Sequence, residues 1–269
     1  RHRTVKTRYR EQINLMAGHN KWSKIKHRKA VVDKRRGKAW TMCARAIIVA
    51  AKHGGGDPNF NIALRTAMDD ARYYNMPNDN IERAVKKGLG GGEGEDYVPV
   101  RYEGYGPGGA AVIVDGLTNN RTRTAGDVRL IFTKHEGKMG VSGAVAHQFD
   151  QLGRIVILGK PADADSIFEA AVNAGAHDVR PLDSDDDEHA SWEVLTAPEQ
   201  YGSVLNTLKA AKLKVGESGI EMLPNLSVIV SGQLAKDLLE MIDALEENDD
   251  VKKVYTNADI PDADLAELE

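Results

Sequence analysis

The cations between Met16 and Lys38 are the residues that most clearly indicate a chemistry. This segment holds nine Lys or Arg residues against one acid, Asp33, in a chain with a net charge of −4. Such a density of positive charge is typical of a surface that binds nucleic-acid phosphates. A solvated basic arm is the alternative, although Trp22 and Ile25 favour an ordered segment. The candidate contact residues are Lys21, Trp22, Lys24, Lys26, His27, Arg28, Lys29, Lys34, Arg35, Arg36 and Lys38.

A second group of basic residues lies in the stretch Thr118–Thr124, which reads TNNRTRT. It joins a predicted strand to a predicted helix and presents Arg121 and Arg123 among hydroxyl and amide side chains. Such a loop can contact a phosphate backbone with the help of the helix N-terminus. A turn that caps its own helix is the alternative, and the residue types leave both interpretations open.

Motifs for catalysis or cofactor binding are missing from the sequence. Gly104–Gly109 matches the pattern G-x-G-x-x-G, but we expect a strand rather than a helix after it, and Pro107 offers no N–H to a pyrophosphate. The eight histidines form no metal-binding pair, and no nucleophile elbow occurs. The acidic loop Asp183–Glu188 lacks the ligand spacing of an EF-hand. We therefore expect no enzymatic activity, no cofactor, no metal and no small-molecule substrate.

Composition and charge indicate an ordinary globular chain with a basic N-terminal segment. Its 269 residues suit two or three domains. Residues 1–38 carry a net charge of +12, which leaves −16 for the remainder. The single cysteine, Cys43, excludes a disulfide framework and is expected to be a small buried hydrophobe. No apolar run is long enough to span a bilayer, so we expect a cytoplasmic protein without a membrane partner.

Apolar spacing predicts three helices in residues 16–92. The first runs from Lys34 to Lys52, and Asn61 caps the second. The third spans Pro77–Lys87, with a capping-box-like pair at Asp79 and Glu82. A glycine-rich linker, Gly88–Asp96, follows and marks a domain boundary.

Beyond the linker the pattern changes to strands alternating with helices. The expected strands are Val100–Glu103, Ala111–Leu117, Val145–Phe149, Arg154–Leu158, Val179–Leu182, Ser191–Leu195, Lys214–Glu217, Leu226–Val230 and Val251–Thr256. The expected helices are Thr122–His135, Asp163–Ala174 with Ile167, Phe168, Ala171 and Val172 inward, Pro198–Lys212 and Ser231–Asn248. The tail after Pro261 is expected to fray.

The order of these elements predicts an α+β multi-domain fold. Residues 151–218 read β-α-β-β-α-β, which is the ferredoxin-like order. Residues 93–150 and 219–260 can pair into a second α/β domain that the first one interrupts. We therefore expect an N-terminal three-helix domain plus two ferredoxin-like α/β domains, one inserted in the other. Two consecutive domains would satisfy the same order.

Several long motifs resemble the YebC/PmpR family. They cover the chain from Met16 to about Ile260 and occur in the expected order. They are Met16–Trp22 (MAGHNKW), Ile25–Lys29, Gly54–Pro58, Asn75–Pro77, Asp79–Ala84, Arg101–Gly109, Thr118–Thr124 and Phe132–His135. The resemblance implies that residues 1–15 are an N-terminal extension, and the loop Asp183–Glu188 departs from the family pattern.

Two functions follow from this resemblance as expectations. Family members are described as DNA-binding transcriptional regulators, whereas mitochondrial relatives resemble translational activators and bacterial members have been linked to ribosomes. The resemblance therefore implies a nucleic-acid-binding regulator of gene expression. The DNA-binding reading is weakened because no helix-turn-helix with a base-reading face is evident. The ribosome-associated reading is favoured by several small domains with polar loops, which suit an irregular RNA surface.

Overall fold

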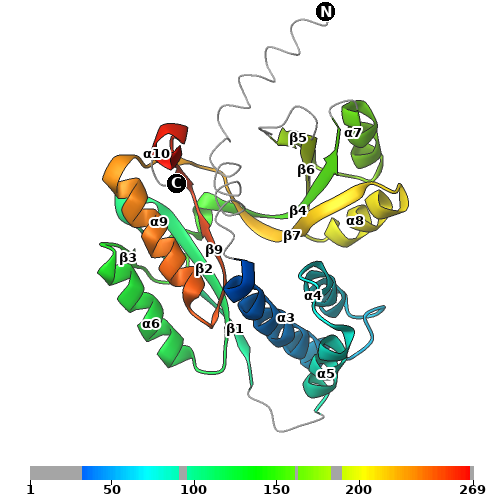
Figure 1. Cartoon of the computed structure of the whole chain (residues 1–269), viewed down its shortest axis with the longest axis horizontal. Coiled ribbons are helices and arrows are strands. Elements are labelled where there is room, and N and C mark those ends of the chain that lie inside the picture. The colour runs from blue at the N-terminus through cyan, green and yellow to red at the C-terminus, as the bar shows by residue number, and fades with distance from the viewer. Residues whose placement is uncertain (1–31, 91–95, 161–162, 183–189, 267–269) are drawn as a thin grey trace, which may run out of the picture. The chain divides into compact units, whose positions relative to one another are not determined.

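A computed structural model describes residues 32–90, 96–160, 163–182 and 190–266. The chain divides into two compact units, of which one contains Asp150–Leu223 and the other contains the segments before and after it. The fold is the expected α+β arrangement, with three N-terminal helices and two α/β domains, one inserted in the other (Figure 1).

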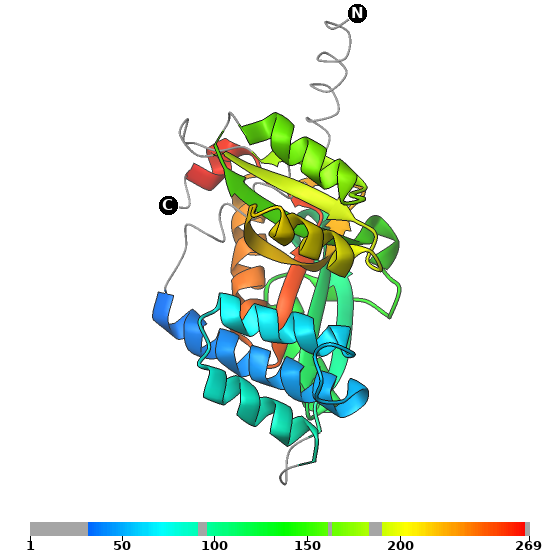
Figure 2. The same ribbon diagram turned by 90° about the vertical axis from the view of Figure 1, so that its right-hand side faces the viewer.

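The first unit begins with the helical domain, in which α3 lies between α4 and α5 (Figure 2). Its core contains Cys43, Ile47, Leu64 and Ile81. Burial raises the pKa of the Cys43 thiol to about 11, so this residue is the buried hydrophobe expected of it. The helices are α3 (Val32–Gly54), α4 (Ile62–Tyr73) and α5 (Asn78–Gly88).

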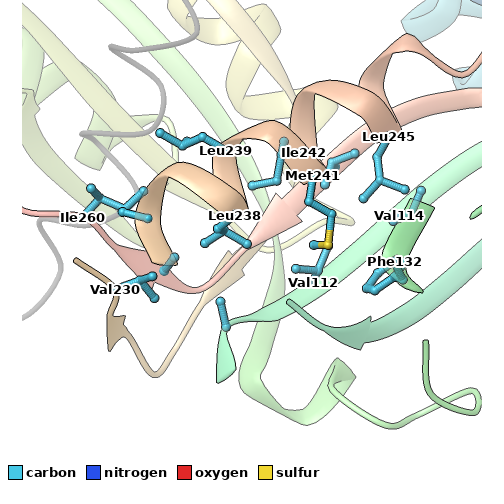
Figure 3. Close-up of a cluster of buried hydrophobic side chains, with 14 of the residues drawn as sticks. Val112, Val114, Phe132, Val230, Leu238, Leu239, Met241, Ile242, Leu245 and Ile260 are labelled. Carbon is cyan, nitrogen blue, oxygen red and sulfur yellow. The ribbon is translucent and has the colours of Figure 1, made fainter. Parts of the chain in front are cut away.

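The same unit contains a four-stranded antiparallel sheet in the order β3-β1-β2-β9. Its two central strands form a hairpin, and α6 and α9 cover one face of the sheet. Figure 3 shows how Leu238 and Met241 of α9 meet Val112 of β2 and Phe132 of α6 in this core. The elements are β1 (Val98–Tyr105), β2 (Ala111–Thr118), α6 (Arg121–Lys134), β3 (Lys138–Met139), α9 (Gly232–Glu247) and β9 (Val251–Thr256).

Short elements complete the first unit. Strands β8 and β10 form a small parallel pair. Their bounds and those of the remaining pieces are η1 (Pro107–Gly109), η2 (Ala146–Gln148), β8 (Val228–Ile229), β10 (Ala258–Asp259) and α10 (Asp262–Ala266).

The inserted unit has the strand order β5-β6-β4-β7, which is the ferredoxin-like order. Ile155 and Ile157 of β4 pack against Ile167 of α7 and Leu208 of α8. A buried ion pair joins Arg154 to Glu193 at 2.5 Å. The elements are β4 (Phe149–Gly159), α7 (Ala164–Asn173), β5 (Asp178–Leu182), β6 (Ala190–Thr196), α8 (Tyr201–Ala210) and β7 (Lys214–Pro224).

Two predictions about local structure in the first unit were wrong. Residues 145–148 are not a strand, because the Glu103 carboxylate accepts the N–H groups of Val145 and Ala146 and so removes them from a ladder. Asp79 and Glu82 form no capping box, because Pro77 occupies the N-cap position of α5 and has no side-chain acceptor.

Other predicted bounds and faces also differ. Phe168 and Val172 are about half exposed, because the fully buried residues of α7 are Ile167 and Ala171. Helix α8 begins at Tyr201, since residues 198–200 form a turn. Of the strand predicted at 226–230, only β8 is a strand in the structure. The tail after Pro261, which was expected to fray, contains α10.

Candidate nucleic-acid interface

Most of the predicted cationic contacts lie outside the described side chains. Lys34, Arg35 and Arg36 belong to the first turns of α3, where only the backbone is described. The residues that lie outside the described part of the chain are Lys21, Trp22, Lys24, Lys26, His27, Arg28 and Lys29. The structure therefore bears directly on three of the candidates, which are Lys38, Arg121 and Arg123.

Lys38 is held by the end of another helix. Its Nζ donates hydrogen bonds to the carbonyl oxygens of Glu246 and Asn248, the latter at 2.6 Å. These carbonyls lie at the C-terminus of α9, where a cation is favoured by the helix dipole. Burial lowers the pKa of Lys38 despite the neighbouring carboxylates Glu246 and Asp249. This ammonium group therefore joins α3 to the α/β domain.

The stretch Thr118–Thr124 is organised around a carboxylate far away in the sequence. Asn120 caps α6 by accepting a hydrogen bond from the Arg123 N–H at 3.1 Å. The hydroxyls of Thr118 and Thr124 donate to Asp250 Oδ2 at 3.0 and 2.7 Å. Arg123 Nη2 donates to the same oxygen at 2.7 Å. The loop therefore caps its own helix, which was one of the two alternatives, and it still carries an exposed arginine, Arg121, whose contact with a phosphate stays a prediction.

A second arginine reaches the same carboxylate from the helical domain. Arg45 Nη1 donates to Asp250 Oδ1 at 3.0 Å and to the Asp249 carbonyl at 2.6 Å. Its guanidinium carbon also lies 4.7 Å from the centre of the Tyr97 ring. We call Asp250 with Arg45, Arg123, Thr118 and Thr124 the Asp250 cluster.

The electrostatics of the Asp250 cluster favour an ionised carboxylate. Burial alone would raise the pKa of Asp250, whose side chain is 5% exposed. The hydrogen bonds from Arg123, Thr124 and Thr118 outweigh burial and hold that pKa below its usual value. The cluster is thus a permanent ion-pair network at neutral pH.

A polar hollow of about 380 Å³ lies beside this network. Three of its lining residues are aspartates, and both of its arginines already bind Asp250, so the hollow is poorly suited to a phosphate. The lining residues are Arg45, Asn119, Arg123, Asp127, Asn248, Asp249 and Asp250.

The outer side of α6 presents cations that the Asp250 cluster does not use. Arg121, Arg129 and Lys134 are exposed, and none of them forms an ion pair with another described residue. Asp127 is the single acid in the helix. The three lie on different sides of the helix and share only their exposure to solvent, and we call them the α6 outer face. Sequence reasoning missed Arg129 and Lys134, although their helical spacing from the inward residues Val128 and Phe132 would have placed them outside.

The glycine-rich turn after β1 is structural. The 3-10 turn η1 and then strand β2 follow β1, as predicted, in place of the helix that a dinucleotide-binding turn requires. A Cβ on Gly106 would lie 2.7 Å from Met241 Cε, so the turn packs closely against α9. The Glu103 carboxylate accepts three backbone N–H groups at 2.9 Å and fixes the segment 143–146. These hydrogen bonds lower the pKa of Glu103 against the opposing effect of burial.

The described residues contain neither a cluster of metal ligands nor a membrane-spanning helix. Within the described ranges, no group of three His, Cys, Asp or Glu residues is placed to hold a metal ion. None of the helices in that part of the chain is long and apolar enough to cross a membrane.

Comparisons with known proteins identify the family. The model of the TACO1/YebC N-terminal domain matches residues 20–91, and the model of the TACO1/YebC second and third domain matches residues 97–258. A crystal structure of a conserved hypothetical protein from Aquifex aeolicus superposes with a TM-score of 0.77 at 40% identity, covering 87% of this chain and 94% of that one.

Curated relatives carry a regulatory name. A protein from Acidithiobacillus ferrooxidans is 51% identical over 256 residues, which is 94% of this chain and 99% of the relative. A protein from Citrifermentans bemidjiense is 48% identical over 253 residues, which is 94% of this chain and 100% of the relative. Both are named "Probable transcriptional regulatory protein", which supports a regulatory role. The predicted resemblance is confirmed, and the chain belongs to the TACO1/YebC family.

Proposed function

We propose that this protein is a nucleic-acid-binding regulator of gene expression, acting on DNA as a transcriptional regulator as the name of its relatives suggests. The observation that carries the proposal is the charge of Met16–Lys38, where nine cations accompany one acid, while the chain beyond residue 38 is net negative. A basic segment on an acidic body directs a polyanion to one side of the molecule.

The α6 outer face supports the proposal within the described residues. Arg121 lies at the first turn of α6, where the positive end of the helix dipole adds to its charge. Arg129 and Lys134 add two exposed cations further along the same helix. Contacts of this type position a nucleic acid without reading its sequence.

A second candidate is a ribosome-associated translation factor that binds RNA. It is favoured by the side chains that α6 presents between these cations. The outer side of α6 presents Thr122, Gly126, Leu130 and Thr133. It lacks the Asn or Gln side chains that pair with adenine in the major groove. A surface that holds phosphates without reading bases suits a structured RNA as well as DNA.

The two candidates are separated by sedimentation of the full chain from cell extract through a sucrose gradient, with crosslinking to identify the bound nucleic acid. A reproducible promoter footprint at physiological salt without ribosome co-sedimentation supports the transcriptional regulator. Specific crosslinks to ribosomal or transfer RNA contradict it and support the translation factor.

The common part of the proposal is tested by charge reversal in the basic segment. The double variant Lys26→Glu and Arg28→Glu is expected to abolish binding to either nucleic acid and to leave the melting temperature nearly unchanged. The matched control is Lys160→Glu with Lys236→Glu, which makes the same charge change at exposed positions elsewhere. Equal loss of binding in the control would show that only net charge matters, and a large loss of stability in the first variant would show that the two residues are structural.

A further inference from the structure

The connection between α3 and α4 presents an unusually exposed aromatic side chain. Phe60 is 89% exposed, and Ile62, two residues later, is 68% exposed. Leu89, which is 57% exposed, lies close by, because a Cβ on Gly56 would be 2.6 Å from Leu89 Cδ1. We call these three residues, two at the start of α4 and one just after α5, the apolar tip, and packing within the described residues does not cover them.

The backbone beneath this tip is fixed by hydrogen bonds. The carbonyl of Asp57 accepts the N–H groups of Phe60 and Asn61 at 3.2 and 2.9 Å. Arg65 donates from Nε to the Pro58 carbonyl at 2.9 Å and from Nη2 to the Asn59 carbonyl at 3.0 Å. A side chain held out from an ordered loop loses little conformational entropy when a partner covers it.

The other end of the same loop is fastened in the same way. The Asn61 Nδ2 group donates at 2.8 Å to the carbonyls of Ala50 and Gly55. Its Oδ1 accepts the Leu64 N–H at 3.0 Å. Asn61 therefore ties the loop to the end of α3 and caps α4 at once.

Basic side chains lie at the two helix ends next to the connection that carries Phe60. The last turn of α3 carries Lys52 and His53, and the last turn of α5 carries Lys86 and Lys87, all exposed. The two helix ends lie together, because a Cβ on Gly88 would be 2.6 Å from the Ile48 carbonyl oxygen.

The acids near the tip are already engaged. Asp96 pairs with Lys52 at 2.6 Å. The Asp57 carboxylate accepts the Asn59 N–H at 2.8 Å. Because Lys52 is paired with Asp96, the positive surround of the exposed aromatic ring consists of Lys86 and Lys87.

We propose that Phe60 is a stacking platform for an unpaired base of a single-stranded nucleic acid, with Lys86 and Lys87 near its phosphates. This inference rests on the proposed function and specifies the form of nucleic acid that the helical domain takes. A single strand is required, because the faces of duplex bases already stack on each other. The positive surround favours a nucleic acid over an apolar protein partner.

The test measures binding of the full chain to fluorescein-labelled 12-nucleotide poly(U), poly(dT) and a duplex of mixed sequence by fluorescence anisotropy. Phe60→Ala is expected to weaken binding to the single strands by roughly 5- to 150-fold, which corresponds to the loss of one base–aromatic stack. Duplex binding is expected to stay within about twofold. Phe60→Trp retains a stacking ring and is expected to keep the affinity of the unchanged protein.

A control variant and a salt series separate this inference from the proposed function. Phe168→Ala removes a half-exposed phenylalanine from α7 of the inserted unit and is expected to change nothing. Because stacking is uncharged, the affinity ratio between the unchanged protein and Phe60→Ala is expected to be the same at 50 and 200 mM salt.

The outcomes that overturn the inference differ from those that overturn the proposed function. If the unchanged protein binds the strands and Phe60→Ala binds them equally, the stacking platform is wrong and the proposed function stands. If the unchanged protein binds no nucleic acid, the proposed function fails as well.

Discussion

The Asp250 cluster and the α6 outer face contain the same kind of side chain within one turn of helix, and they use it differently. Arg123 is bound to a buried carboxylate 127 residues away, whereas Arg121 points into solvent. Their neighbours in the sequence are almost identical, since each follows an Asn or Thr and precedes a Thr. The difference lies in the partner that the fold brings to each one.

The contrast between Arg121 and Arg123 indicates which cations remain available to a ligand. A carboxylate that is buried with two arginines and two hydroxyls is satisfied internally, so its arginines join segments of the chain to each other. Lys38 belongs with this group, because it binds the end of α9. Cations without such a partner, such as Arg121 and Arg129, are the ones we expect to meet phosphates.

The largest effect is expected from Asp250→Ala. Removing this carboxylate leaves Arg45, whose side chain is 15% exposed, without its charge partner and deprives Thr118 and Thr124 of their acceptor. We expect a loss of about 3–5 kcal/mol in the free energy of unfolding, as for other broken buried pairs. Urea denaturation followed by circular dichroism measures it.

The control for this variant is Asp127→Ala, which removes an exposed acid that lines the same hollow. Its free energy of unfolding is expected to change by less than about 0.5 kcal/mol. A loss below about 1 kcal/mol in Asp250→Ala would mean that the cluster contributes little and that the two regions do not differ as described.

A smaller effect is expected when the two arginines of the loop are compared directly. Arg123→Ala is expected to lower the free energy of unfolding by about 1 kcal/mol, because this side chain is half exposed and its pair with Asp250 is partly screened. Arg121→Ala is expected to change stability by less than about 0.5 kcal/mol and to weaken nucleic-acid binding instead. Melting and binding experiments on both variants check this prediction. A stability loss in Arg121→Ala together with a binding loss in Arg123→Ala would contradict the comparison.

The smallest effect concerns pH. The pKa of Asp250 in the folded protein lies below its usual value of 3.8. The ionised form therefore contributes stability above pH 3.8, and this contribution is lost as the pH falls through the folded pKa. We expect the stability difference between the unchanged protein and Asp250→Asn to be constant from pH 7 to 5 and to shrink below pH 4. A difference that grows on acidification would contradict the ionised network.

Local patterns in the sequence predicted most of the elements. The helix from Asn61 was found because Asn is a strong N-cap and the apolar spacing is regular, and the structure shows the predicted cap. The strand expected at 145–149 was wrong because Glu103, about forty residues earlier, takes its N–H groups. Half of the predicted inner face of α7 is exposed because tertiary packing uses a narrower stripe than the apolar pattern offers.

The candidate site was less predictable than the fold. Asp250 follows Asp249 near the end of an acidic helix, and in the sequence nothing distinguishes it from a solvated charge. Its partners Arg45 and Arg123 come from segments 205 and 127 residues away. Local spacing carries no signal for such pairings, so Arg123 and Lys38 were predicted as phosphate contacts without their internal partners.

The most direct test of the account is the salt dependence of nucleic-acid binding by the full chain. With six to ten phosphates engaged, the logarithm of the binding constant is expected to fall against the logarithm of salt concentration with a slope of roughly −5 to −9 on duplex DNA. Arg121→Glu with Arg129→Glu is expected to make this slope shallower by about two, whereas Arg123→Lys leaves it unchanged. A slope near zero, or a slope that Arg121→Glu with Arg129→Glu does not change, would contradict the assignment of the exposed cations to phosphate binding.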